Sequence, residues 1–465
     1  MKRRTILLAG AAVAAAGAGL SAWRASRPPT GWDEDFDVIA VGGGAAGLSA
    51  AATSAAAGAS VLLLEKEPQL GGDTLISGGN FNAVVPSSAQ NGLPPDSEAL
   101  FLSQILDSGA GLNSPDVAAA LATGASGALA WLKSLGMRFL PGVREIYGGR
   151  FPRAHKPVLP RGEGYIRALL AECERRKVQI RLSSPVRSLI RAQDGRVLGV
   201  AVTDNGAPKL IRARRGVIIA SGGYGSSRDM LKTYAPDFAD LPHDNAPGVT
   251  GEMILAGRQA GATVMNMNLV ECIPGSGQDS DGQIRLDIAP TRMIMVNSRG
   301  RRFVDETDYR ARITQAILKL TPRRCWSIAD SDTVASYDLA TQKSLHRGLH
   351  AGTIFRARTP GELAAQIGVP PRALAQTMSE MRLRRGLRTP PFWAAPVNLR
   401  VHATLGGLKI DSRGRCLDPS GLPIPGLWAA GAATGNVHGA NRLGGNGINT
   451  AVVFGRAAGE DAARA

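Results

Sequence analysis

Apolar runs of strand length alternate with glycine-rich turns in the first part of the chain. Residues 36–41 (FDVIAV) and residues 61–64 (VLLL) are two such runs, and each predicts a buried strand. Residues 45–57 between them are rich in alanine, which favours a helix, and Gly58 marks the end of that helix. The predicted order is therefore strand, glycine turn, helix, strand.

The pattern of a strand that runs into glycine returns later in the chain. Residues 185–191, 197–203 and 210–213 predict three short strands, because turn signals at Asp194-Gly195 and Asn205-Gly206 separate them. Residues 216–220 (GVIIA) and 426–431 (GLWAAG) each predict a strand that leads into a glycine turn. These segments predict an α/β fold, in which a Rossmann-like domain is assembled from both chain ends and an α+β capping domain is inserted in the middle.

The glycine turn after the first strand has the spacing of a dinucleotide site. Gly42 permits a tight turn, Gly44 lets the backbone approach a pyrophosphate, and Gly47 lets helix and strand pack closely. The helix N-terminus attracts phosphate, and Glu65 after the second strand can accept a ribose hydroxyl. Strand, helix and acid stand in the expected order, which makes the motif far more specific than G-x-G-x-x-G alone.

A second glycine-rich loop distinguishes between the two common dinucleotides. Residues 71–80 (GGDTLISGGN) follow Glu65, and a NAD dehydrogenase has no need of such a loop there. The isoalloxazine ring of FAD, in contrast, must lie against backbone. Residues 221–225 (SGGYG) are interpreted as another flavin contact rather than as a second nucleotide site. The sequence therefore predicts FAD.

Composition limits the partners and metals that we expect. The 465 residues suffice for two or three domains. The net charge of +16 suits a nucleic-acid binder or an anionic substrate, but no basic stripe is interleaved with aromatics, so no nucleic-acid partner is expected. The four cysteines form no C-x-x-C pair, which argues against covalent haem and structural zinc and leaves a disulfide open. His346 and His350 have helical ligand spacing without a third ligand nearby, so no metal is expected.

The first 31 residues have the form of a targeting segment and linker. Lys2, Arg3 and Arg4 precede an apolar, Ala/Gly-rich run at residues 6–22, which predicts an export signal. The Arg3-Arg4 pair indicates the twin-arginine route and therefore a periplasmic protein. No clean A-x-A site precedes the linker, so an uncleaved membrane anchor remains the alternative, and the membrane would be contacted only through this segment.

From about residue 35 to residue 459, the chain resembles the flavoprotein family of fumarate reductase and succinate dehydrogenase, especially its soluble flavocytochrome-type branch. The most specific motifs are residues 71–83, 295–306 (MVNSRGRRFVDE), 402–407 (HATLGG) and 439–446 (GANRLGGN). Membrane members of the family bind FAD covalently through a His in the first loop. Asp73 stands at that position, which implies non-covalent FAD.

The resemblance implies the domain limits and the cofactor contacts. The FAD-binding domain is expected at residues 35–268 and 402–459, and the cap at residues 269–401. The residues expected at the cofactor come from the turn, the two loops and the C-terminal motif: Gly42, Gly44, Ala46, Gly47, Glu65, Lys66, Gly72, Asp73, Thr74, Ser77, Gly78, Gly79, Val186, Ser221, Gly222, Gly431, Asn446, Gly447 and Ile448.

The resemblance also implies three catalytic residues. His402 and Arg442 match the residues that hold a substrate carboxylate, and Arg310 matches the family's proton donor. Hydride would pass from reduced flavin to the β-carbon of an α,β-unsaturated acid, and the reverse is a dehydrogenation, so the direction is open. Two plainer roles also remain open: Arg442 on the FAD pyrophosphate, and Arg310 in a salt bridge to Asp305 or Glu306 in the cap.

Departures from the family pattern change the expected substrate. Ile273 and Gly275 replace a His and a Thr that help to hold the second carboxylate of fumarate. An ungapped count places Leu286 and Ala289 where the family has the Glu and Arg of its proton route. An apolar wall cannot compensate a buried carboxylate, so a small monocarboxylic acid is expected rather than fumarate. Glu271, Arg285, Asp287 and Arg292 offer another proton route.

Two other classes of function remain as alternatives. A ketosteroid-type FAD dehydrogenase has the same architecture but needs no carboxylate clamp, and a flavin electron-transfer protein needs none of the three catalytic residues. Asn441-Arg442-Leu443 disfavours the ketosteroid dehydrogenase, and the joint presence of Arg310, His402 and Arg442 disfavours the electron-transfer protein. The chain has no haem motif, so a separate cytochrome or quinol-linked protein is the expected electron partner.

Overall fold

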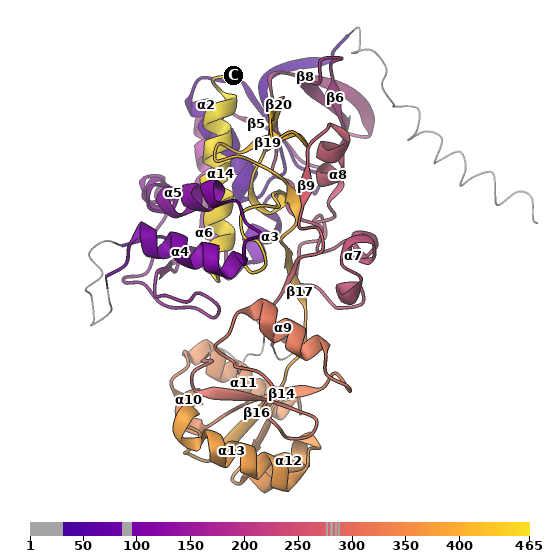
Figure 1. Cartoon of the computed structure of the whole chain (residues 1–465). Coiled ribbons are helices and arrows are strands. Elements are labelled where there is room, and N and C mark those ends of the chain that lie inside the picture. The colour runs from indigo at the N-terminus through magenta and orange to yellow at the C-terminus, as the bar shows by residue number, and fades with distance from the viewer. Residues whose placement is uncertain (1–30, 86–94, 276–277, 280–281, 284–285, 287–288) are drawn as a thin grey trace, which may run out of the picture.

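The computed structural model describes residues 31–85, 95–275, 278–279, 282–283, 286 and 289–465. Figure 1 shows two lobes, a larger one that contains both the first and the last described elements and a smaller one formed by the middle of the chain. The predicted export signal lies outside the described residues. Within them, no helix is both long and apolar enough to cross a bilayer.

The larger lobe is built on an eight-stranded sheet. Its path is β19 (Arg415–Leu417), β20 (Pro423–Ala429), β8 (Ala207–Ile219), β1 (Glu34–Val41), β2 (Val61–Leu64) and β5 (Gln179–Arg181), with β7 (Val197–Asp204) on β8 and β6 (Val186–Arg191) on β7. β1 pairs in parallel with both β2 and β8, and β20 pairs in parallel with β8. The last strands of the chain therefore extend the sheet begun by the first, which confirms the Rossmann-like assembly from both ends.

The larger lobe also contains eight helices among the described residues. They are α2 (Ala45–Ala56), α3 (Gly72–Ile76), α4 (Glu98–Gly109), α5 (Pro115–Ser134), α6 (Glu163–Arg175), α7 (Arg228–Tyr234), α8 (Glu252–Gln259) and α14 (Asn446–Ala462). α2 and α14 lie side by side (Figure 1), and a Cβ on Gly459 would stand 2.5 Å from the Ala50 carbonyl oxygen. Glycine at this position therefore permits the close approach of the two chain ends.

The predicted strands are confirmed except at one place. Residues 210–213 and 216–220 were expected as two strands, but β8 runs unbroken through both. Gly216 has φ +155, and a Cβ there would stand 2.5 Å from the carbonyl oxygen of Gly426. Glycine thus lets β8 continue past the crowded point, so that its first half pairs with β7 and its second half with β20.

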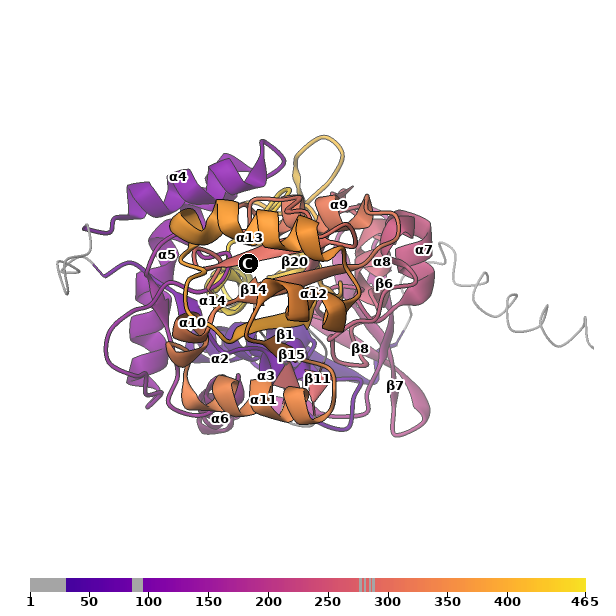
Figure 2. The same ribbon diagram turned by 90° about the horizontal axis from the view of Figure 1, so that it is seen from below.

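The smaller lobe contains an antiparallel sheet in the order β13 (Met293–Asn297), β14 (Cys325–Ala329), β16 (Phe392–Pro396) and β15 (Phe355–Ala357). Its helices are α9 (Arg310–Leu318), α10 (Ser331–Ala335), α11 (Leu339–His350), α12 (Pro360–Ile367) and α13 (Pro371–Arg385). α11 and α13 lie on opposite sides of the sheet (Figure 2). Ile294 and Val296 belong to a core with α12 and α13, whereas Met293 and Met295 face the other core, as the two-residue period of a strand requires.

Short ribbons and turns join these parts. β10 (Val270–Cys272) pairs with β17 (Val401–Thr404) at the junction of the two lobes, and β9 (Val264–Met265) pairs with β18 (Gly407–Leu408). β3 (Phe81–Asn82) pairs with β4 (Ala154–His155), and β11 (Gln278–Asp279) with β12 (Gly282–Gln283). Two 3-10 turns, Pro236–Phe238 and Gly431–Ala433, complete the described elements.

Candidate active site

The glycine turn after β1 forms one end of a large cavity. Gly42 has φ +114, and a Cβ there would stand 2.5 Å from the Ala220 carbonyl oxygen. A Cβ on Gly47 would stand 1.8 Å from the oxygen of Gly42, so neither position accepts a larger residue without a shift. Gly44 is the N-cap of α2, and the cavity of about 2880 Å³ opens at this helix start. Helix N-termini favour phosphate, so the turn suits a pyrophosphate.

Glu65 lies beside that turn. Its carboxylate is buried and accepts two backbone amides, from Gly43 at 2.6 Å and from Glu67 at 2.9 Å. Each carboxylate oxygen has a second lone-pair direction, and Glu65 lines the cavity. An acceptor fixed in this way fits the ribose hydroxyls of a dinucleotide.

The second glycine-rich loop is tied to the first. Thr74 Oγ1 accepts the backbone amide of Ala45 at 3.1 Å, which anchors α3 to the start of α2. Asp73 Oδ1 accepts the amide of Ala246 at 2.6 Å. Burial raises the pKa of the Asp73 carboxyl to about 6. Ser221 also lines the cavity, and its buried hydroxyl has no hydrogen-bond partner among the described residues. This hydroxyl can therefore form a hydrogen bond with a ligand.

Most of the predicted cofactor residues line this single cavity. Those that do are Gly42, Gly44, Ala46, Glu65, Lys66, Gly72, Asp73, Thr74, Ser77, Gly78, Gly79, Val186, Ser221, Gly222, Gly431, Gly447 and Ile448. Gly47 instead packs against Gly42. Asn446 does not line the cavity. It is fully buried and accepts a hydrogen bond from Asn82 Nδ2 at 2.8 Å, which fixes the C-terminal motif to the segment at β3.

The three predicted catalytic residues line the same cavity, although they come from distant parts of the chain. Arg310 is the first residue of α9, Arg442 lies in the segment before α14, and His402 lies on β17. A buried acid, Glu271 on β10, lies between the two arginines. Arg442 donates from Nε at 2.7 Å and pairs through NH2 at 2.5 Å, both with Oε2, while Arg310 pairs with Oε1.

His402 is oriented by an acid that the sequence did not indicate. Its Nδ1 lies 3.0 Å from Oδ1 of Asp244. A carboxylate on Nδ1 fixes the imidazole so that Nε2 is the nitrogen left for other contacts. Asp244 precedes α8 in the chain by only a few residues and carries no motif of its own, so spacing alone could not have found it.

His438 is a further cavity residue outside the predicted set. Burial, with the nearby charge of Arg442, lowers its pKa to about 3, so the imidazole is neutral. Its position directly before the 439–446 motif was the one available signal. The loop at residues 144–147 also lines the cavity and carries no recognisable motif.

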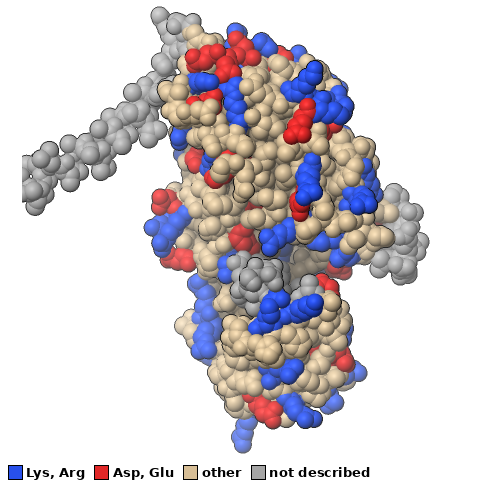
Figure 3. Space-filling view, turned by 180° about the vertical axis from the view of Figure 1, so that it is seen from behind, with Lys and Arg blue, Asp and Glu red and all other residues tan. Residues whose placement is uncertain are grey.

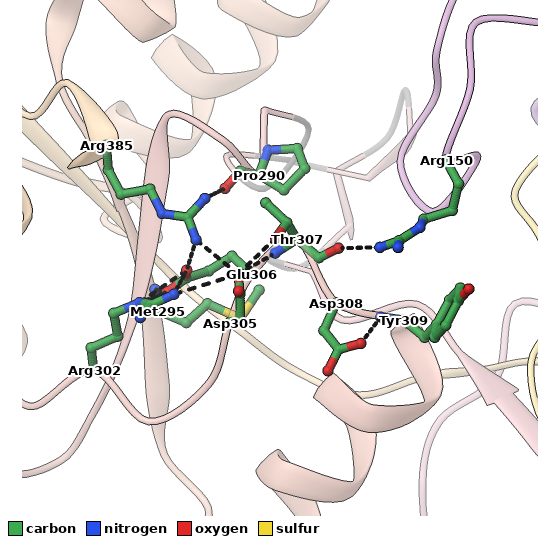
Figure 4. A network of polar contacts seen from close by, with 10 residues as sticks. All are labelled: Arg150, Pro290, Met295, Arg302, Asp305, Glu306, Thr307, Asp308, Tyr309 and Arg385. Atoms are coloured by element: carbon green, nitrogen blue, oxygen red, sulfur yellow. Dashed lines mark hydrogen bonds and ion pairs between the residues drawn. The ribbon is translucent and has the colours of Figure 1, made fainter. Parts of the chain in front are cut away.

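Asp305 and Glu306, the two acids considered as partners of Arg310, have other partners in the structure. Glu306 accepts from Arg302 at 2.8 Å, and Arg385 donates to Asp305 at 2.8 Å (Figure 4). Glu306 also accepts the backbone amide of Met295 at 2.7 Å. These acids are therefore satisfied inside the smaller lobe, and Arg310 points instead to Glu271.

The positions of the expected departures are apolar. Ile273 lines the cavity, Leu286 is fully buried and Ala289 is partly buried. Arg285 and Asp287 lie outside the described residues. The four cysteines are buried and unpaired with one another. On the face in Figure 3, basic and acidic side chains are interspersed over both lobes.

Comparison with known proteins gives a consistent match over nearly the whole chain. A family model described as an FAD binding domain matches residues 37–448. A probable fumarate reductase of Shewanella frigidimarina is 30% identical, over 93% of this chain and 78% of that protein. An NADH:acrylate oxidoreductase of Vibrio harveyi is also 30% identical, over 92% of this chain and 50% of that protein.

Solved structures agree with these sequence matches. The open conformation of a flavocytochrome c3 fumarate reductase has a TM-score of 0.75 and 31% identity, over 93% of this chain and 79% of that one. A 3-ketosteroid-Δ4-(5α)-dehydrogenase from Rhodococcus jostii has a TM-score of 0.78 and 26% identity, over 94% of this chain and the whole of that one. The fold thus serves both acid and steroid substrates, and the choice depends on the side chains in the cavity.

Proposed function

The chain belongs to the FAD binding domain family, and from that premise we propose that it reduces the carbon–carbon double bond of a small α,β-unsaturated monocarboxylic acid, or catalyses the reverse dehydrogenation. The cofactor is FAD. The observation that carries the proposal is that Arg310, His402 and Arg442 line the same cavity as the nucleotide turn. A carboxylate clamp and an FAD cradle therefore share one continuous space.

FAD, when bound in this cavity, would supply or accept the hydride. Arg442 holds the substrate carboxylate, because a planar guanidinium makes two-point contacts with a carboxylate. Its Nε and one NH2 proton are taken by Glu271, so the NH1 side remains for the substrate. His402, fixed by Asp244, donates from Nε2 to the same carboxylate. Both residues stabilise the negative charge that builds toward the α-carbon and the carboxylate.

Arg310 is the proposed proton donor to the α-carbon. Its guanidinium is buried at the start of α9 and donates to the backbone carbonyl of Arg442 at 2.9 Å. This fixed position favours transfer over a short path, which an arginine needs because its free pKa is above 12. The smaller lobe, proposed as a cap at residues 269–401, contributes Arg310 to the cavity. The FAD-binding domain is proposed at residues 35–268 and 402–459.

The substrate is proposed to carry one carboxylate. Ile273 lines the cavity where the resembling family has a histidine, so the distal wall offers no charged partner there. One of the similar proteins is named an NADH:acrylate oxidoreductase, and this name supports the same substrate class. The steroid alternative is disfavoured, because a neutral steroid has no use for the paired guanidinium groups of Arg310 and Arg442.

The test is anaerobic. The purified protein is reduced with dithionite, and acrylate, aryl acrylates, fumarate and a ketosteroid are each screened for flavin reoxidation. Reoxidation by an acrylate-type acid is the expected result. Reoxidation by the steroid alone supports the steroid alternative, and reoxidation by none of them supports an electron-transfer protein.

We further propose that the FAD is bound non-covalently and that the protein is exported to the periplasm by the twin-arginine route. The support for the first is that Asp73 holds a backbone amide where a covalent linkage needs a histidine. The support for the second is the Arg3-Arg4 pair. Replacing both arginines by lysine should retain the protein in the cytoplasm. A separate cytochrome or quinol-linked protein is the proposed electron partner.

A further inference from the structure

Glu271 is a buried carboxylate held between the two arginines that the proposed function assigns to catalysis. Its exposed fraction is 3%, and that of Arg310 is 4%. Oε2 contacts Arg442 through both Nε and NH2, and Oε1 contacts Arg310. Two cations at the substrate end of the cavity therefore share one internal anion.

The backbone fixes this arrangement. Glu271 lies on β10, and its register partner on β17 is Ala403, the neighbour of His402. The ribbon of β10 and β17 joins the two lobes, so Glu271 is held by paired strands rather than by a surface loop. Burial pushes the pKa of Glu271 upward, but the charges of Arg310 and Arg442 overcome this and hold it at about 2. The carboxylate is thus ionised at neutral pH.

A count of charges follows from these contacts. Arg310 and Arg442 carry two positive charges, and Glu271 removes one of them. His402 lies beside Asp244, so the imidazole has a carboxylate next to it. Asp73, also near His402 and Arg442, can only add negative charge. Glu271 thus lowers the positive charge that Arg310 and Arg442 present to a substrate.

We infer that Glu271 is a specificity-determining residue, which limits this site to substrates with a single carboxylate. The inference rests on the proposed function, in which Arg442 and Arg310 serve an unsaturated acid. Glu271 leaves only part of the arginines' positive charge for a substrate, and a second carboxylate would add to its buried negative charge, where charges interact strongly. Glu271 acts together with the apolar Ile273, since one limits the charge and the other withholds a partner.

The variant that isolates the charge is Glu271→Gln, which keeps the shape and removes the negative charge. Glu271→Asp keeps the charge and shortens the side chain. Glu172→Gln is the matched control, because Glu172 is also buried between two arginines, Arg175 and Arg176, on α6. Binding of acrylate and fumarate to the oxidised holoenzyme is measured by isothermal titration, which needs no turnover, and KM for both acids is measured with the reduced enzyme.

Glu271→Gln is expected to shift the ratio of fumarate to acrylate affinity toward fumarate by roughly tenfold or more, as loss of one buried like charge implies. Glu271→Asp and Glu172→Gln should keep the wild-type ratio. An unchanged ratio in Glu271→Gln, or an equal shift in Glu172→Gln, overturns the inference.

The two proposals fail in different ways. Wild-type enzyme that reduces no unsaturated acid refutes the proposed function, whereas the titrations still report how many carboxylates the site accepts. If Glu271→Gln cannot be purified with FAD bound, the test uses the binding of fumarate and acrylate to the wild-type enzyme and to Glu271→Asp. Weaker binding of fumarate than of acrylate to both supports the inference, and equal or tighter binding of fumarate to either contradicts it.

Discussion

The guanidinium of Arg310 donates to the backbone carbonyl of Arg442 across 2.9 Å. Next to it, the amide of Ala311 donates to the side chain of Asn441 at 3.2 Å. The start of α9 is thus docked on the 439–446 segment, so the proposed proton donor and the proposed carboxylate clamp are held in one fixed relation although 132 positions separate them.

Replacing Arg442 with Ala should abolish turnover of every acid. The change removes the carboxylate clamp and also leaves Glu271 with one cation fewer. Loss of a charge-assisted contact to the reacting acid is worth about a hundredfold or more in kcat/KM. The measurement is acid-dependent oxidation of the reduced flavin, with Arg175→Ala on the surface of α6 as the control. Turnover within tenfold of wild type would show that Arg442 is not the clamp.

Replacing Arg310 with Gln should lower kcat by a much larger factor than it raises KM for an acrylate-type acid. The reason is that Arg310 acts on the α-carbon, whereas Arg442 and His402 hold the carboxylate. General acids contribute about a hundredfold to ten-thousandfold. Steady-state kinetics under anaerobic conditions separates the two parameters, and a defect confined to KM would assign Arg310 to binding instead.

Acid precipitation of the purified protein should release all of its FAD into the supernatant. Asp73 accepts the amide of Ala246 at the position where covalent members of the resembling family have a histidine, and a carboxylate there is bonded to backbone rather than to flavin. Absorbance of the supernatant near the flavin band is the measurement. Yellow colour retained in the pellet would contradict this reading of Asp73.

Asp73→Asn should stabilise the protein above pH 6 and have little effect near pH 4. Burial raises the pKa of Asp73 from 3.8 to about 6, so the folded state prefers the neutral acid. The stability that this preference provides is complete below pH 3.8 and is lost as pH rises through 6. The gain from Asn is therefore at most about 3 kcal/mol at pH 7, since each pKa unit is worth about 1.4 kcal/mol. Thermal unfolding of the holoenzyme from pH 4 to 8 tests it, and a gain that is the same at all pH values would refute it.

Ile273→His should shift the preference from acrylate-type acids toward fumarate. A histidine on this wall gives the second carboxylate a donor that isoleucine lacks, and an unmatched carboxylate costs several kcal/mol, of which about 1.4 kcal/mol already equals tenfold in specificity. The ratio of kcat/KM for the two acids is the measurement, with Ile273→Val as the control. If wild-type enzyme already prefers fumarate, the argument from Ile273 is wrong.

The local features of this protein could be predicted from its sequence, and the long-range pairings could not. The strand, turn and helix around Gly42 follow from residues within one short segment, because chain geometry and hydrophobic period act locally. Glu271 and Arg442 are 171 positions apart, and their contact depends on how β10 and the 439–446 segment meet in space. Glu271 was visible only as one of several nearby charges, and Asp244 gave no signal at all.

One wrong expectation also shows that local sequence does not determine where a strand ends. Residues 210–213 and 216–220 were expected as separate strands, yet β8 runs through residues 214 and 215 without a break. Whether a glycine ends a strand or lets it continue depends on the neighbouring strand, here β20, which comes more than 200 residues later. Such a choice is made by tertiary packing rather than by local preference.

The packing of α14 against α2 has a consequence for the order of events in the cell. A nascent chain acquires β1, α2 and β2 early, but it lacks the neighbour of β8 and the cover of α2 until β20 and α14 have left the ribosome. Gly431, Gly447 and Ile448, which line the cofactor cavity, come from that last stretch as well. The cofactor cavity is therefore complete only after these residues have been synthesised and α14 has packed against α2.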